Sequence, residues 1–259
     1  MRTSWAIGGL VVKELYRRKD FYVLFVLTAV LTILLGSMNF FGDISAARYL
    51  KELCLLLIWI SVMVIAIATT ARQIPAEMEQ RTIFPLLAKP VTRWHLVFGK
   101  FLGCWAASCI ALAVFYLFFG VVSAAREKEI VFANYAYALV LQAAFAAVVI
   151  AMTLLGSVTI STPSANTTLS LIVAGSVLFV GRHLGQIAQR LDEPVRTLLQ
   201  LVYFTMPHLE FFDMRDMLVH NRAAISFAWF LGALGYAMLY SAFFLCATWL
   251  VFRRKALTL

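Results

Sequence analysis

Long apolar runs without a single charged residue are the feature that most constrains this chain. Six such runs, of 18 to 31 residues, lie at residues 21–41, 53–71, 101–125, 130–160, 164–181 and 223–252. A helix needs about 20 apolar residues to cross a bilayer, whereas the strands of a membrane barrel alternate apolar and polar residues over about 10 positions. We therefore predict an all-α integral membrane protein with six transmembrane helices in one domain, residues 1–259.

The overall composition agrees with lipid as the solvent. Hydrophobic residues make up 63% of the chain and charged residues 14%, whereas a soluble domain has roughly 45–50% and 25%. The first run exceeds the apolar core of a signal peptide, which is about 7–15 residues long. We expect it to be a retained first span, with no cleavable signal peptide. The four cysteines stand singly in apolar runs, which is typical of packing residues.

The charges divide unequally between the two sides of the predicted bundle. One side would hold the N-terminus, the loop 72–100, the turn 161–166 and the C-terminus, with 13 basic and four acidic residues. The other side would hold nine of each, so the whole net charge of +9 lies on one side. By the positive-inside rule that side is cytoplasmic. We expect a multi-pass protein of the inner (cytoplasmic) membrane with both termini in the cytoplasm. Its basic side would interact with anionic lipid headgroups, and we expect no binding of nucleic acid.

Several kinds of chemistry are missing from the six runs. They contain no Asp, Glu, Lys, Arg or His, and their most polar residue is Gln142. Ionisable groups at membrane depth are the usual means of ion coupling, so their absence argues against an ion-coupled carrier and an intramembrane enzyme. The chain also lacks a P-loop GxxxxGK[ST], and its four histidines form no close ligand pair. We expect no catalytic residue, cofactor or metal in this chain.

The first 20 residues have an amphipathic pattern. Ile7, Leu10, Val11 and Leu15 recur at helical spacing, and charged residues are interleaved with them: Lys13, Glu14, Arg17 and Arg18. This pattern predicts a helix lying on the cytoplasmic surface. The alternative is that these residues are simply the positively charged segment that precedes the first span.

Two segments outside the runs are also predicted to be helical. In the loop 72–100, Pro75 opens a run of helix formers at 76–87 whose first acids, Glu77 and Glu79, favour the helix macrodipole. This predicts a short helix held against the membrane, with a charged face available to a cytoplasmic partner. In the segment 182–222, apolar residues near helical spacing predict short interfacial helices over the outer side, or a re-entrant hairpin.

The segment 77–100, EMEQRTIFPLLAKPVTRWHLVFGK, resembles the cytoplasmic loop of the type-2 exporter permeases of ATP-binding-cassette (ABC) transporters. The ordered matching positions are Glu77, Glu79, Thr82, Leu86, Leu87, Pro90, Arg93, Gly99 and Lys100. The start of the chain, Lys13-Glu14-Leu15 and then Arg17-Arg18-Lys19, is similar to the start of that family. The chain departs from the pattern at Gln80-Arg81, where the family often has a glycine before the threonine.

The resemblance implies the permease subunit of an ATP-driven exporter. Such a subunit pairs with a second copy or a paralogue and with cytoplasmic ABC ATPase subunits, which hold the ATP and Mg. The loop 72–100 would contain the coupling helix, residues 1–20 would form the elbow helix and 182–222 the external gate helices. The implied ATPase-coupling residues are Glu77, Glu79, Arg81, Thr82, Leu86, Leu87, Pro90 and Arg93, and those of the elbow helix are Lys13, Glu14, Arg17 and Arg18.

A non-transporting membrane scaffold or assembly factor is the alternative function. The sequence leaves the transported substrate open, and it does not decide between a homodimer and a heterodimer.

Overall fold

The computed structural model describes residues 44–79, 92–124, 132–188, 195–219 and 225–254, and the single positions 9, 13, 22, 23, 25, 26, 29, 30, 32, 33 and 193. Every regular element in this part is helical. The elements are α3 (Ile44–Ala71), α4 (Gln73–Glu79), α6 (Arg93–Ala124), α7 (Phe132–Thr159), α8 (Pro163–Ala188), α9 (Val195–Thr205), the 3-10 helix η1 (Leu209–Phe212), α10 (Arg215–Val219) and α11 (Phe227–Arg254). The all-α prediction is confirmed for the described residues.

Four helical stretches are long and apolar enough to cross a membrane. They are Lys51–Glu79, Arg93–Val121, Ala133–Thr159 and Phe227–Arg254, and they overlap with the predicted second, third, fourth and sixth spans. The predicted fifth span corresponds to a shorter apolar stretch of α8, Pro163–Phe179. The predicted first span, 21–41, lies mostly outside the described residues, so the count of six remains a prediction. One residue of that span, Phe25, packs against Phe115 of α6 with 5.6 Å between the ring centroids.

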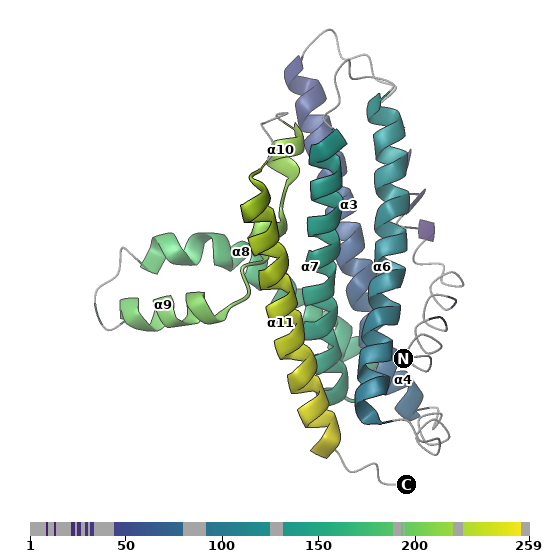
Figure 1. Cartoon of the computed structure of the whole chain (residues 1–259), viewed down its shortest axis with the longest axis vertical. Coiled ribbons are helices and arrows are strands. Elements are labelled where there is room, and N and C mark those ends of the chain that lie inside the picture. The colour runs from purple at the N-terminus through teal and green to yellow at the C-terminus, as the bar shows by residue number, and fades with distance from the viewer. Residues whose placement is uncertain are drawn as a thin grey trace.

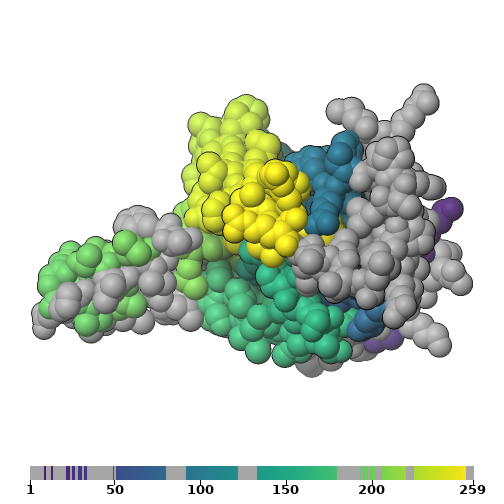
Figure 2. Space-filling view, turned by 90° about the horizontal axis from the view of Figure 1, so that it is seen from below, coloured from purple at the N-terminus to yellow at the C-terminus, as the bar shows by residue number. Residues whose placement is uncertain are grey.

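The long helices α3, α6, α7 and α11 stand side by side (Figure 1). The core between them consists of apolar side chains removed almost fully from solvent, such as Ile58, Phe115, Leu141, Phe145 and Phe252. The end of α8 and the whole of α9 form a hairpin that projects sideways from these helices, as Figures 1 and 2 both show.

The helices meet at one end, at the bottom of Figure 1. The C-terminal ends of α4, α7 and α11 lie there together with the N-terminal ends of α6 and α8. We call this the basic end, because its described residues include Arg72, Arg93, Lys100, Arg253 and Arg254. The helix directions agree with the predicted alternation of spans. The assignment of this end to the cytoplasm remains a prediction.

Helix α10 packs against α3 and α7, away from the basic end. Arg215 donates two hydrogen bonds to Asp213, of 2.8 Å from Nε and 2.7 Å from Nη2. This contact raises the pKa of Arg215, and the guanidinium lies 5.4 Å from the centroid of the Trp59 ring of α3. The short helices expected in 182–222 agree with α9, η1 and α10, and the predicted gate role of that segment stays untested.

Several helix boundaries differ from the sequence-based ones. Helix α3 begins at Ile44 rather than at residue 53, and α8 ends at Ala188 rather than at residue 181. Helix α4 begins at Gln73, ahead of Pro75, which the first turn of a helix tolerates because its N–H groups have no partner inside the helix. Helix α6 begins at Arg93 rather than at residue 101. Lys100 is therefore inside a helix, and it is 7% exposed.

A buried asparagine connects three helices near the basic end. Asn166 of α8 is fully buried, and its Nδ2 donates to the carbonyl of Ala71 at 3.2 Å and to that of Thr153 at 3.4 Å. Its Oδ1 accepts from the Ser170 hydroxyl at 3.3 Å. The amide thus joins the end of α3 to α7, and Gly156 of α7 leaves the room for it, since a Cβ at that position would collide with Oδ1.

We predict that Gly156→Ala lowers the free energy of unfolding by about 1–3 kcal/mol, the usual effect of overpacking a close contact. The measurement is thermal unfolding of the detergent-purified protein. Gly175→Ala in α8 is the matched control, because its Cβ would meet nothing within 4 Å. Equal melting temperatures for Gly156→Ala and wild type would contradict the tight contact.

Candidate functional site

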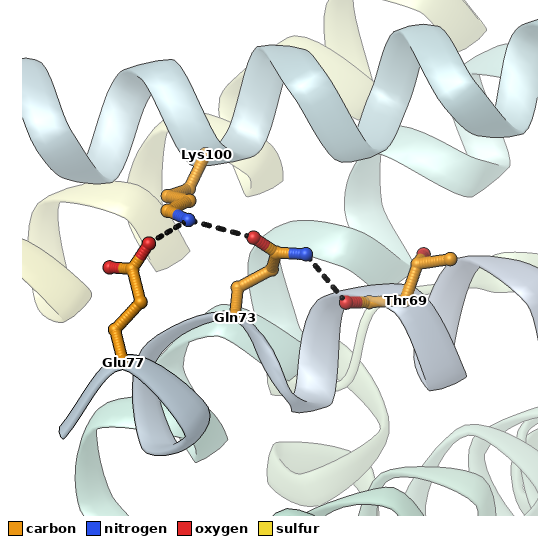
Figure 3. A network of polar contacts seen from close by, with 4 residues as sticks. All are labelled: Thr69, Gln73, Glu77 and Lys100. Atoms are coloured by element: carbon orange, nitrogen blue, oxygen red, sulfur yellow. Dashed lines mark hydrogen bonds and ion pairs between the residues drawn. The ribbon is translucent and has the colours of Figure 1, made fainter. Parts of the chain in front are cut away.

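The clearest polar constellation of the basic end lies where α4 meets α6 (Figure 3). The ammonium of Lys100 points from α6 toward α4, where it forms an ion pair with Glu77. It also donates to Oε1 of Gln73 at 2.9 Å, and Nε2 of Gln73 donates to the Thr69 carbonyl at 3.2 Å. We call these four residues the Lys100 network.

Burial makes this network energetically important. The side chains of Lys100 and Glu77 are only 8% and 19% exposed, and a charge away from water is costly unless it is paired and hydrogen-bonded. Gln73, itself 4% exposed, supplies a further acceptor to the ammonium. The network therefore fixes α4 against α6 and links both to the last turn of α3.

A second contact fastens α11 to the start of α6. Arg93 donates from Nη1 to the carbonyls of Phe252 at 2.6 Å and Arg253 at 3.0 Å. Its guanidinium also lies 5.4 Å from the centroid of the Phe252 ring. The last carbonyls of a helix have no partner inside the helix and carry the negative end of its dipole, so a cation there is stabilising.

The structure gives the predicted coupling residues different surroundings. Glu77 faces Lys100 inside the protein, and Arg93 binds the end of α11, whereas Glu79 is exposed. The others, Arg81, Thr82, Leu86, Leu87 and Pro90, lie outside the described residues. Of the predicted elbow residues, Lys13 is helical and exposed, and Glu14, Arg17 and Arg18 lie outside the described part. Contact of any of them with an ATPase remains a prediction.

The described residues offer little to a metal. Within them, no three His, Cys, Asp or Glu side chains are grouped so that they could hold an ion. Cys54 and Cys104 are buried, and neither forms a disulfide. The polar groups that do meet are suited to binding helices to each other.

The sequence did not reveal the buried contacts of two residues in this region. Lys100 was assigned to a loop because it directly precedes an apolar run, and Asn166 was assigned to a polar turn. The available signal for Lys100 was its position directly before the 25 uncharged residues 101–125, because a helix formed by this run can begin ahead of its first apolar residue. For Asn166 no local signal exists, because its partner Ala71 is 95 residues away in the chain.

Together these features describe a multi-pass helical membrane protein whose spans are tied by polar contacts at one end. Residues 12–255 match the family described as ABC-2 family transporter protein. The match covers nearly the whole chain, so this protein belongs to that family, and it is an ABC-2 type permease rather than the ATPase. A search of the curated proteins gives no match.

We predict that Lys100→Met destabilises the protein by about 3 kcal/mol, because it removes one partner of a buried ion pair. The double variant Lys100→Met/Glu77→Met should recover most of that loss. Thermal unfolding in detergent measures both, with exposed Arg72→Met as the control at the same helix junction. A double variant as unstable as the single one would show that the pair is not the anchor.

Proposed function

We propose that this chain is the transmembrane subunit of an ATP-driven ABC exporter. In this proposal it dimerises with a second copy or a paralogue, and separate ABC ATPase subunits drive it from the cytoplasm, which places the basic end on that side. The observation that carries the proposal is the attachment of α4 to the bundle. Helix α4 holds the acidic pair of the coupling motif, and the buried pair between Glu77 and Lys100 binds it to α6.

The two acidic residues of the motif would then have different roles. Glu77 anchors α4 from the inside, and exposed Glu79, with Arg81 after it in the sequence, contacts the ATPase. A displacement of α4 is passed to α6 through Lys100 and to α3 through Gln73, because a close-packed interior moves as rigid pieces. Arg93 extends the connection from α6 to α11.

The interior of the spans supports an energy source outside the membrane. Between the described middle parts of α6 and α7 the polar contacts are neutral ones. The Tyr116 hydroxyl donates to Gln142 Oε1 at 2.9 Å, and the Trp105 indole N–H donates to the Ala143 carbonyl at 2.9 Å. A gradient-driven carrier would instead need ionisable or ion-coordinating groups at this depth. ATP hydrolysis in a partner subunit supplies the work without such groups.

The test reverses the exposed charges of the motif. We expect Glu79→Arg/Arg81→Glu to abolish copurification of the host's ABC ATPase and permease-stimulated ATP hydrolysis, while membrane insertion stays normal. The matched control is Glu193→Arg/Arg196→Glu, which exchanges the same two charge types at exposed positions outside the loop. Wild-type hydrolysis in the Glu79→Arg/Arg81→Glu variant would overturn the coupling role. If no ATPase copurifies with the wild type, the scaffold alternative is favoured.

A further inference from the structure

An apolar pocket of about 210 Å³ lies between η1 and the first half of α11. Its lining consists of Phe211 from η1 and four residues of α11: Trp229, Gly232, Ala233 and Tyr236. The four are spaced i, i+3, i+4 and i+7, so they form one stripe along the helix. The pocket is the space between this stripe and the Phe211 ring.

The aromatic walls are held in place by contacts with each other and with His208. Phe211 and Tyr236 pack edge to face with 5.6 Å between their centroids, and His208 stacks on Phe211 at 5.4 Å. The Tyr236 hydroxyl accepts the backbone N–H of His208 at 2.8 Å. The polar tip of Tyr236 is thus used by the chain itself, and an occupant would meet aromatic rings and small apolar residues.

The pocket is open toward the outside of α11. Trp229 and Phe211 are 43% and 41% exposed, and a Cβ on Gly232 would meet nothing within 4 Å. Beside it, Leu231, Met238 and Leu239 are more than half exposed. Since α11 is a candidate span, this uncharged surface has hydrocarbon as its natural neighbour.

The pocket lies at the depth of the lipid acyl chains in the bilayer. The 28 residues of α11 extend over about 42 Å, so the stripe from Trp229 to Tyr236 lies about 3 to 14 Å from its N-terminal end. A hydrocarbon core of about 30 Å centred on this helix starts about 6 Å from the same end. Trp229 therefore lies at the interface, where tryptophan is enriched, and Tyr236 lies within the acyl-chain region of one leaflet.

The volume and the uncharged lining of the pocket restrict which ligand it can bind. Pockets for drug-sized ligands have about 300–1,000 Å³, so this one admits only a slender group. Its lining carries no charge for a lipid headgroup or an ionic solute. We propose that it binds one acyl chain of a bilayer phospholipid, inserted between η1 and α11 from the leaflet at the N-terminal end of α11. The site does not depend on the transport function.

The experiment uses the full chain in phosphatidylethanolamine/phosphatidylglycerol vesicles. The probe is phosphatidylethanolamine with a photoreactive diazirine in one acyl chain, and mass spectrometry locates the cross-links. In the wild type, labelling of Phe211 and Tyr236 should saturate as the probe fraction rises. Labelling of Met238 and Leu239 on the open face should rise in proportion to the probe.

A second experiment fills the pocket with a side chain. Gly232→Leu places a side chain in the open space and should lower labelling of Phe211 by about tenfold, which corresponds to about 1.4 kcal/mol of binding free energy. Gly235→Leu is the matched control, because Gly235 is exposed on the same helix outside the lining and its Cβ also meets nothing within 4 Å. It should leave labelling unchanged.

Three results would overturn the proposal. The first is labelling of Phe211 and Tyr236 that rises in proportion to the probe, as expected of bulk lipid. The second is equal labelling in Gly232→Leu and Gly235→Leu. The third is cross-linking of this surface to a second copy of the chain in place of lipid. The saturation measurement needs only the wild type, so it stands even if Gly232→Leu does not fold.

Discussion

A buried ammonium on α6 is the contact on which the described arrangement depends. Lys100 lies inside a helix and away from solvent, so its charge must be met by α4, through Glu77 and Gln73. Electrostatic contacts strengthen where water is excluded, and they become a liability if one partner is lost. The position of α4 is therefore set by an obligatory pairing, and apolar packing alone would leave it free to slide along the neighbouring helices.

Polar chemistry in this protein is used mainly to join helices. In a bilayer, apolar side chains gain little by leaving lipid for one another, so packing and hydrogen bonds between helices matter more than in water. The Asn166 amide reaches carbonyls of α3 and α7, and Arg93 binds the last carbonyls of α11. Away from the basic end, the Arg215 guanidinium, paired with Asp213, lies against the Trp59 ring of α3. Between the middle parts of α6 and α7 the described polar contacts are neutral, such as that between Tyr116 and Gln142.

The sequence predicted the helices better than the contacts between them. Runs of about 20 apolar residues are a local signal, which is why α3, α6, α7 and α11 could be predicted. The start of α6 was placed too late because a lysine was assumed to end a span, whereas Lys100 has partners on α4 that hydropathy does not reveal. Asn166 looked like a turn residue, since its contact with Ala71 depends on how α8 packs. The pocket beside Gly232 likewise exists only once η1 folds back on α11.

The glycine at 156 sets a limit on how this family member can vary. A helix–helix contact that depends on the absence of a side chain does not tolerate even the smallest addition, so Gly156 and Asn166 can be exchanged only together. A smaller residue at 166 would free the space but leave the Ala71 and Thr153 carbonyls without their donor. Substitutions at these two positions, ten positions apart in the chain, are therefore expected to be coupled.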